Sequence, residues 1–431
     1  MNMKEYQRCA KEMLEFIEKS PTAYHAVANL KEEFANLGFR ELKETDQWEL
    51  EPGHGYYVAR NDSALIAFRI PQGDAPKGFH ISAAHADSPT FKIKESPEMA
   101  VEGAYLKLNT EKYGGMILSA WLDRPLSVAG RVVVRGKAGC ETRLVNIEKD
   151  LMVIPSVAIH MNRDTGKGGE LNPQTDMLPL YGECSDGKKD NVLLRQVARA
   201  VGVKQEDILG HDLFLYVRDK GRLLGESGEF VLSPRLDDLQ CVYASARGFT
   251  ESAPGSYINV CAVFDNEEVG SGTKQGANST FLEDVLWRIG EGMGLGRSGF
   301  LRMIAGSFLI SADNAHAVHP NHPEKADPTN KPYLNRGIVI KFHGSQKYAT
   351  DAVSAARMRE ICEKAEVPCQ TYANRSDIAG GSTLGNISTA HVSVSTVDIG
   401  LPQLAMHSAV ETAGVKDTKY AVEAFRVFFS E

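Results

Sequence analysis

Several apolar, β-branched runs in this chain end directly in acidic or histidine side chains. The clearest run is Ile258 to Phe264, which is followed by Asp265-Asn266-Glu267-Glu268 and a glycine-rich turn. A run of this kind predicts a strand that is buried on both faces. The turn after the strand swivels the backbone, so the side chains of Glu267 and Glu268 are predicted to converge on one pocket. This feature favours a fold in which the ends of several strands meet.

Four further strand-like runs end in the same way, and together they change the interpretation of the glutamate pair. Alone, two adjacent acids are more typical of a solvated loop, and a histidine beside a strand is more typical of a core. In open α/β sheets, however, ligand sites form outside the carboxyl ends of the strands. The side chains that we expect at these ends, besides the glutamates, are His85, Asp87, Asp237, Asp313 and His407.

The chain of 431 residues predicts two domains, because a single core of this size is uncommon. Strands alternate with helical stretches before residue 92 and again after residue 228, which is the sign of βαβ units. We therefore predict a discontinuous mixed-sheet α/β domain that covers residues 1–92 and 228–431. Residues 93–227 contain short alternating runs without acidic ends and predict an inserted β-rich domain.

Composition excludes several classes of function. The net charge of −8, with no long basic run, disfavours nucleic acid as a partner. No apolar run approaches the ~20 residues that span a membrane, and the N-terminus lacks a signal-peptide pattern. Seven scattered cysteines contain no Cys-x-x-Cys pair, which favours reduced thiols over disulfides or a cysteine-built zinc site. The predicted location is the cytoplasm.

The expected strand-end side chains are suited to metal ions and to proton transfer. Two histidines, two aspartates and one glutamate form a mixed nitrogen and oxygen set that suits zinc, manganese or cobalt. Five ligands are too many for one catalytic zinc ion, but they fit two ions if one carboxylate bridges them. Such a pair lowers the pKa of a water molecule and polarises a carbonyl group. A further carboxylate would carry the proton from water to a leaving amine, so the set predicts a dinuclear hydrolase.

Five segments with these side chains resemble the signatures of the aspartyl aminopeptidase family, which includes vacuolar aminopeptidase I-like proteins. They occur in the family's order, and the similarity covers essentially the whole chain. Two positions differ, because the family usually has Thr at the position of Ala86 and Asn at the position of Asp238. The matching segments are 85–89, 233–237, 265–271, 311–321 and 406–408.

The resemblance implies a role for each strand-end residue. Asp87 would orient His85, and Glu267 would be the general base and then the general acid. The five metal ligands would be His85 and Asp313 on one ion, Glu268 and His407 on the other, and Asp237 as the bridge.

The resemblance also implies that residues 1–92 and 228–431 form a mixed-sheet α/β catalytic domain of the zinc exopeptidase type, and that residues 93–227 form an inserted β-rich dimerisation domain. It further implies a substrate pocket and an oligomer. His316, Lys341 and Tyr348 would line the pocket, and a buried Lys341 would pair with an acidic side chain on the first residue of the substrate. His160, in the predicted insert, would enter the active site of a neighbouring subunit. The chain is thus expected to form a homo-oligomer built from dimers, up to a dodecamer.

The predicted function is removal of the N-terminal residue from short peptides by a metal-dependent aminopeptidase, with a preference for Asp or Glu. One alternative is another dinuclear hydrolase on the same scaffold, either a carboxypeptidase or an N-acyl amino acid deacylase. These enzymes share the ligand plan and differ in the groups around the substrate. A second alternative, from another class, is a non-catalytic metal-binding assembly protein.

Overall fold

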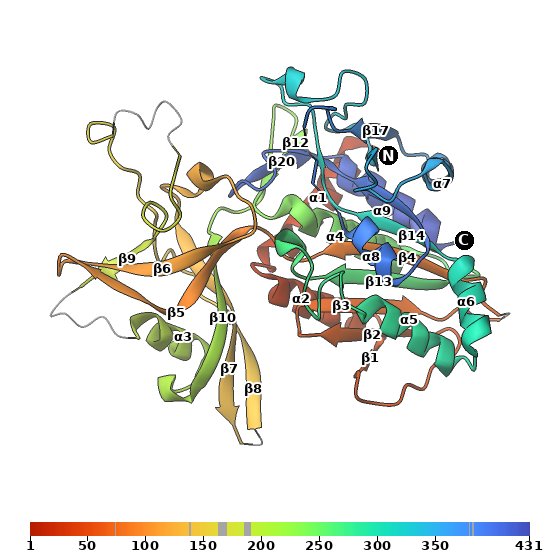
Figure 1. The fold of residues 1–431 in the computed structure, drawn as a ribbon, viewed down its shortest axis with the longest axis horizontal. Coiled ribbons are helices and arrows are strands. Elements are labelled where there is room, and N and C mark those ends of the chain that lie inside the picture. The colour runs from red at the N-terminus through yellow and green to blue at the C-terminus, as the bar shows by residue number, and fades with distance from the viewer. Residues whose placement is uncertain (74, 138, 163–169, 185–190, 379, 382) are drawn as a thin grey trace. The chain divides into compact units, whose positions relative to one another are not determined.

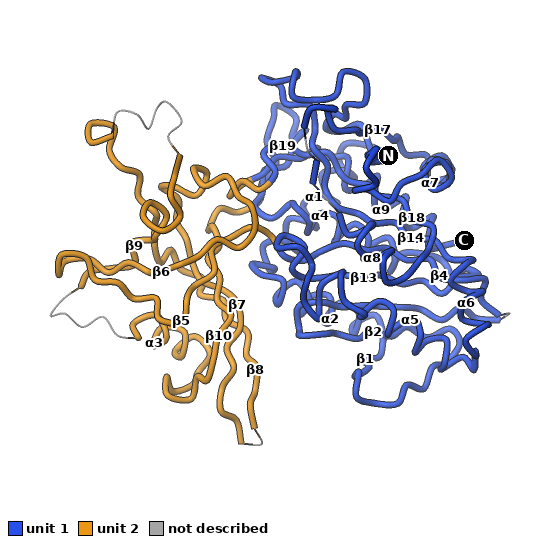
Figure 2. Tube along the Cα trace, in the orientation of Figure 1, with its two compact units in different colours: residues 1–87, 221–406, 411–431 blue, residues 88–220, 407–410 orange. Residues whose placement is uncertain are grey.

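The computed structural model describes residues 1–431 except residues 74, 138, 163–169, 185–190, 379 and 382. The described residues form two compact units, coloured separately in Figure 2. Unit 1 comprises residues 1–87, 221–406 and 411–431, and unit 2 comprises residues 88–220 and 407–410. The units therefore change at 87/88 and 220/221, whereas the sequence placed the domain boundaries at 92/93 and 227/228. A dimerisation role for unit 2 stays a prediction.

Unit 1 is built on a nine-stranded mixed sheet, which confirms the predicted α/β class (Figure 1). Its central strands β13, β4, β14 and β18 run parallel to one another, and the strands on either side of them, β3 and β16, pair antiparallel. Their side chains are buried on alternate faces, because helices cover both sides of the sheet. In sheet order the strands are β1 (Arg40–Leu42), β2 (Gly55–Arg60), β3 (Ala64–Arg69), β13 (Ile258–Phe264), β4 (Phe79–His85), β14 (Phe308–Ala312), β18 (Ser395–Gly400), β16 (Ile338–Phe342) and β17 (Cys369–Ala373).

Two hydrophobic cores flank this sheet. The first core contains large aromatic side chains such as Phe34, Phe249 and Phe428, and the second contains Phe79 and Phe281. The helices that contribute to the first core are α1 (Met3–Glu18), α2 (Ala23–Asn36), α4 (Leu236–Glu251), α7 (Ala352–Lys364) and α9 (Asp417–Phe429). Those that contribute to the second core are α5 (Phe281–Gly292), α6 (Arg297–Ala305) and α8 (Leu384–His391). No helix among the described residues is both long and apolar enough to cross a membrane.

A separate five-stranded sheet in unit 1 corrects one premise of the sequence analysis. We expected Asp237 at the end of a strand of the main sheet, but β12 belongs to this smaller sheet. Asp237 itself lies in the first turn of α4, because the chain turns at Pro234 and at Arg235, whose φ is 57°. The strands, in sheet order, are β11 (Arg222–Leu224), β12 (Phe230–Ser233), β20 (Glu411–Gly414), β19 (Pro402–Leu404) and β15 (Ala315–His316).

Unit 2 contains a six-stranded antiparallel sheet and the helix α3 (Val192–Val201). Side chains such as Phe91, Trp121 and Leu213 form its core, and Ala409 from the short segment 407–410 joins them. In sheet order the strands are β8 (Gly139–Asn146), β7 (Leu126–Gly136), β10 (Ile208–Val217), β5 (Thr90–Val101), β6 (Tyr105–Tyr113) and β9 (Leu180–Glu183).

The register of the parallel strands in unit 1 aligns their carboxyl ends. Phe264 on β13 is paired with His85 on β4, and Ser311 on β14 is paired with Ala83. Asp313, two residues after Ser311, therefore stands at the level of His85. Glu267 and Glu268 follow in the 3-10 turn Glu267–Val269 just after β13. The backbone thus brings the predicted strand-end side chains of unit 1 to one edge.

Candidate metal centre

His85 is the centre of this edge. Its ring is buried, with Nδ1 3.1 Å from the backbone oxygen of Asp87 and 3.3 Å from the Asp87 carboxylate. Its other nitrogen, Nε2, lies 3.5 Å from Asp237 Oδ1 and 3.8 Å from Asp313 Oδ1. Because Nδ1 faces an acceptor, Nε2 is the nitrogen that faces the remaining acids, the usual arrangement for a histidine ligand.

The carboxylate of Asp87 connects β4 to the turn after β13. Its Oδ1 accepts a hydrogen bond of 3.1 Å from the backbone N–H of Glu267, and its Oδ2 accepts one of 3.2 Å from that of Glu268. The turn begins at Asn266 with a φ of 63° and ends at Gly270 with a φ of 94°. One buried aspartate thus holds both the His85 ring and the backbone that carries the two glutamates.

Asp237 and Asp238 reach the centre from the first turn of α4, and both are buried. The peptide bond that joins them is cis. The N–H of Asp237 donates to Glu411 Oε2 at 3.0 Å, and the N–H of His85 donates to Asp238 Oδ2 at 3.2 Å. Asp238 therefore supports the backbone of His85, a contact that the sequence did not predict.

Asp313 and Lys341 form a close pair at the other side of the cluster. Lys341 Nζ lies 3.5 Å from Asp313 Oδ2, and it donates a hydrogen bond of 2.8 Å to the backbone oxygen of Asn314. The approach requires a glycine at position 400, because a Cβ there would lie 2.2 Å from Asp313 O and 2.8 Å from Lys341 Cε. Burial lowers the pKa of Lys341, but Asp313 and Tyr348 raise it more, so the ammonium group stays charged.

Negative charge exceeds positive charge in this cluster. Burial, together with neighbours such as Asp313, raises the pKa of Glu267 to about 7. Burial also raises the pKa values of Glu268 and Asp238 well above their usual range. Burial lowers the pKa of His85, but hydrogen bonds to Asp237, Asp313 and Asp87 raise it well above the usual value. The carboxyl groups that lie around the His85 imidazole and the Lys341 ammonium group are Asp87, Asp237, Asp238, Glu267, Glu268 and Asp313.

These residues fit a divalent cation. Ligand atoms of His85, Asp237 and Asp313 lie within 4.8 Å of one another, and so do those of His85, Glu267 and Glu268. Imidazole and carboxylate donors suit zinc and similar ions. Without a cation the excess of carboxylates favours bound protons, and a divalent ion would replace those protons with a stronger positive charge.

The other predicted site residues of unit 1 lie next to this cluster or on a cavity in the same unit. Tyr348 is buried, and its ring centroid is 5.6 Å from Lys341 Nζ. His316 is exposed at the end of β15, with its ring 6.3 Å from that of Tyr372, and both line a cavity of about 450 Å³. Lys325 and Arg375 line the same cavity. Tyr372 was missed because nothing in its strand sequence marks it as a pocket residue.

The two remaining predicted residues belong to unit 2. His407 has a φ of 64°, and its backbone oxygen accepts a hydrogen bond of 3.0 Å from the N–H of Ile117. In the chain it directly follows Met406, which belongs to unit 1. His160 is exposed in a turn of unit 2. The ligand role of His407 and the substrate role of His160 stay predictions.

An α/β domain with buried histidine and acids at aligned strand ends defines a metal-dependent hydrolase, and comparison with known proteins gives the family. The family described as "Aminopeptidase I zinc metalloprotease (M18)" matches residues 16–429, so the chain belongs to it. The chain is 50% identical to a probable M18 family aminopeptidase 2 of Clostridium novyi over 432 residues, covering 99% of this chain and 100% of the relative.

Solved structures agree with this assignment. One is the Ape4 and Nbr1 complex, with a TM-score of 0.95, 38% identity, and 99% and 86% of the two chains covered. Another is the mApe1 dodecamer of S. cerevisiae, with a TM-score of 0.86, 28% identity, and 99% and 97% covered. The chain is therefore a metal-dependent aminopeptidase that acts on peptides, which confirms the predicted family and enzyme class. The carboxypeptidase, deacylase and non-catalytic alternatives are not favoured.

Proposed function

We propose that this aminopeptidase uses two divalent ions, most simply zinc, to remove single N-terminal residues from short peptides, with a preference for Asp or Glu. The observation that carries the proposal is the contact of Asp87 with both His85 and the backbone of Glu267 and Glu268. Through this contact, Asp87 would hold three groups in a constant relative position: the histidine His85, the metal-binding carboxylate of Glu268 and the proton-transferring carboxylate of Glu267.

In this proposal His85 and Asp313 hold one ion, Glu268 and His407 hold the other, and Asp237 bridges them. Ions bound there would supply polarisation of the substrate carbonyl and acidification of a water molecule. The short spacings among His85, Asp237 and Asp313 support the first set. His407 lies in the loop between β19 and β20, and the first residue of β20, Glu411, accepts a hydrogen bond from Asp237.

Glu267 is proposed as the group that moves the proton. Its carboxylate would take a proton from the attacking water and give it to the nitrogen of the leaving amine. A pKa of about 7 in the buried site suits a group that must both accept and release a proton near neutral pH. Asp87 would act as a positioning residue that keeps the Glu267 backbone in place.

The Glu267→Gln variant tests the proposal. It should retain its bound metal and lose activity by at least ~10²–10⁴-fold, because proton transfer alone is worth that factor. Turnover of aminoacyl-arylamides and metal content by elemental analysis are measured on the same preparation. Glu283→Gln, an exposed change on α5, is the matched control. Unchanged turnover in Glu267→Gln would remove Glu267 from the mechanism.

The acidic preference rests on the positive side chains of unit 1 near the cluster. Lys341 is buried beside Asp313, and the neighbouring cavity is lined by His316, Lys325 and Arg375. Lys341→Ala should reduce turnover of Asp-arylamide more than that of Leu-arylamide, since only the first offers a carboxylate. Lys274→Ala, an exposed change, serves as the control. Equal losses for both substrates would reject Lys341 as the source of the preference.

A homo-oligomer built from dimers, up to a dodecamer, is part of the proposal. The mApe1 neighbour is a dodecamer. In this chain, the apolar residues Val157, Ile159 and Met161 lie next to His160 in the sequence, and all three are exposed. Such apolar exposure is typical of a protein interface. Light scattering would give the subunit number, and a monomer with full activity would reject the role of His160 in a neighbour's site.

The proposed location is the cytoplasm. All seven cysteines are free, including the buried Cys9, Cys184 and Cys241. Free thiols are typical of a reducing compartment. Fractionation of cells that produce the protein would test this location, and recovery outside the cytoplasm would contradict it.

A further inference from the structure

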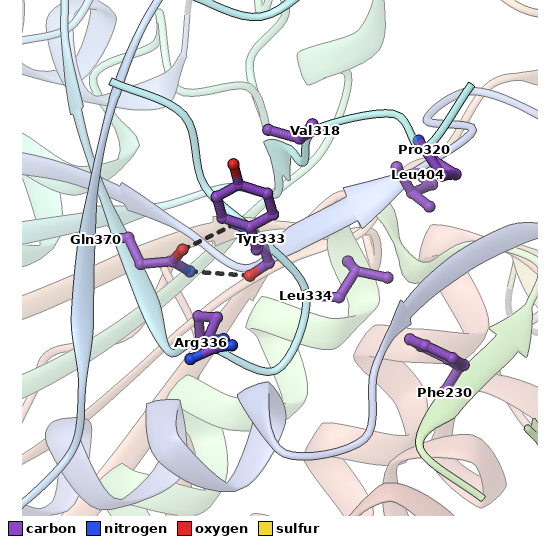
Figure 3. Close-up of a pocket in the computed structure, with 8 residues that line it drawn as sticks. All are labelled: Phe230, Val318, Pro320, Tyr333, Leu334, Arg336, Gln370 and Leu404. Carbon is purple, nitrogen blue, oxygen red and sulfur yellow. Dashed lines mark hydrogen bonds between the residues drawn. The ribbon is translucent and has the colours of Figure 1, made fainter. Parts of the chain in front are cut away.

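A second cavity, of about 760 Å³, is lined by described residues of unit 1 (Figure 3), and none of these residues belongs to the titratable cluster described above. Its volume is within the ~300–1,000 Å³ that is usual for small-ligand sites. It is formed by the start of β12, the end of β19, the segment after β15 and the turn that precedes β16. The apolar side chains that line it are Phe230, Val318, Pro320, Tyr333, Leu334 and Leu404.

Arg336 is the only charged side chain among the described residues that line this cavity. It is exposed, and its guanidinium makes no ion pair with the part of the chain that the structure describes. Its backbone is nevertheless fixed, because the two oxygens of Asp417 accept hydrogen bonds of 2.7 Å from Asn335 N–H and 2.9 Å from Gly337 N–H. An arginine whose backbone is held in this way can present its guanidinium group to a carboxylate and bind it through two parallel hydrogen bonds.

The aromatic wall of the cavity is also held in place. The side-chain amide of Gln370 accepts a hydrogen bond of 2.8 Å from Tyr333 N–H and donates one of 3.0 Å to Tyr333 O, as the dashed lines in Figure 3 show. The same amide donates to Gly337 O at 3.3 Å. The turn between Tyr333 and Gly337 is thus fastened to β17, while the Tyr333 side chain remains 47% exposed. A preformed wall reduces the entropy that a ligand must lose on binding.

One wall of the cavity lies close to the metal cluster along the chain. Val318 on its wall is five residues after Asp313, and five extended residues span at most ~17 Å. Leu404 lines both this cavity and the cavity beside His316. A peptide of about five extended residues is therefore long enough to reach from the Asp313 end to the Val318 wall.

We propose that this cavity binds the C-terminal end of short peptides, with the terminal carboxylate on Arg336 and an apolar last side chain among Phe230, Leu334 and Leu404. The inference rests on the proposed function only in taking the ligand to be the substrate. Charge complementarity carries it, because the described lining is apolar apart from Gln370 and one cation, Arg336, which has no ion-pair partner among the described residues. Such a cavity favours an apolar ligand with one carboxylate. The cavity would make the enzyme selective for peptides with a free, apolar C-terminus.

Direct binding to the metal-loaded protein tests the inference. The probes are an N-acetylated pentapeptide that ends in Leu and the same peptide with a C-terminal amide, both of which lack the free amine that the enzyme processes. Calorimetry should show the free acid binding ~10–100-fold more tightly than the amide, the range for hydrogen bonds to charged groups. In Arg336→Gln this ratio should fall to about one, and in Arg336→Lys to an intermediate value because a lysine keeps the charge without the fork.

Arg302→Gln, which removes an exposed arginine from α6, should keep the wild-type ratio. Equal binding of acid and amide by the wild-type protein, or an unchanged ratio in Arg336→Gln, would overturn the inference. Turnover of single aminoacyl-arylamides, which are too short to reach the cavity, tests the proposed function separately. If these are cleaved while the acid and amide bind equally, only the cavity inference fails. If they are not cleaved while binding still depends on Arg336, only the proposed function fails.

Discussion

The two units treat acids that are wholly or partly buried in opposite ways. In unit 2, Asp212 on β10 accepts from Lys92 Nζ at 3.1 Å and from Arg131 Nε at 3.0 Å. Burial raises the pKa of Asp212, but the hydrogen bonds to Lys92 and Arg131 outweigh it and lower the pKa overall. In the cluster of unit 1 the carboxyl groups outnumber the cations, and the pKa of Glu267 is raised to about 7.

This difference separates a structural ion pair from a binding site. Burying charge costs free energy unless each charge is paired, so an acid with two basic neighbours is complete within the fold. An excess of buried carboxylates is not complete and becomes favourable only when protons or a metal cation join it. The sites of a protein at which buried charge remains unbalanced are therefore its candidates for function.

Removing the metal is expected to have the largest effect, because peptidase activity depends on the cluster of unit 1 and not on the ion pair of unit 2. Dialysis against a chelator should reduce peptidase activity by several orders of magnitude, and added zinc, manganese or cobalt should restore it. The carbonyl polarisation and water acidification depend on the cation. Activity is measured with aminoacyl-arylamides before and after each metal is returned. Full activity in protein shown by elemental analysis to be metal-free would contradict the assignment of the cluster.

The pH dependence of stability should change with the metal. In the metal-free protein, Glu267 and Asp265 have folded pKa values of about 7, above the ordinary value of about 4.5 or below in the unfolded chain. A raised pKa stabilises the fold fully below the unfolded value, and this contribution is lost as pH rises through about 7. The pKa shift from 4.5 to about 7 corresponds to about 3 kcal/mol for Glu267, and the shift from 3.8 to about 7 corresponds to about 4 kcal/mol for Asp265. Thermal unfolding between pH 4.5 and 7.5 should show the metal-free protein losing stability as pH rises.

The metal-loaded protein is the control for that measurement. Metal binding requires deprotonated ligands, so its stability should instead rise with pH over the same interval. If the stability of the two forms changed with pH in the same way, the cluster would neither bind the metal nor carry the excess protons.

Asp87→Asn should weaken metal binding less than the loss of a ligand does. The amide keeps an acceptor for one backbone N–H but loses the charge that faces His85 Nδ1 and the second acceptor oxygen. Changes of such supporting groups cost ~10–100-fold in metal affinity or activity. Competition with a fluorescent chelator measures the affinity. An unchanged affinity would mean that Asp87 serves the fold alone.

The sequence was informative about this cluster because strand ends are local features. The run Ile258 to Phe264 became β13 with the same bounds. Parallel pairing then aligned His85, Glu267 and Asp313, a consequence of strand order that the acidic ends already suggested. These predictions succeeded because apolar periodicity and the carboxyl-end rule both act along a few consecutive residues.

Features that depend on distant contacts could not be predicted. The β-branched residues 392–399 do not all form a strand, because β18 begins only at Ser395, after the helix α8 that ends at His391. The support of His85 by Asp238 joins residues 153 positions apart, and the fastening of Tyr333 by Gln370 joins residues 37 apart. Sequence spacing carries no signal for such pairs, since only the tertiary fold brings them together.

One substitution in each unit tests the difference between the units directly, and its expected effect on stability is the smallest of those predicted. In the metal-free protein, Asp212→Asn should destabilise the fold by about 1 kcal/mol, the upper range for a partly exposed ion pair. Asp238→Asn should change the stability by less than about 0.5 kcal/mol. Burial raises the pKa of Asp238 well above its usual range and so disfavours its charged form, and an amide oxygen can accept the hydrogen bond from His85 N–H just as well. Urea unfolding of both variants against the wild type gives the two values.

A larger loss of stability in Asp238→Asn than in Asp212→Asn would contradict the comparison. It would mean that the fold of unit 1 depends on the charge of Asp238. The acids of the cluster would then be balanced within the fold by more than their contacts with His85 and Lys341.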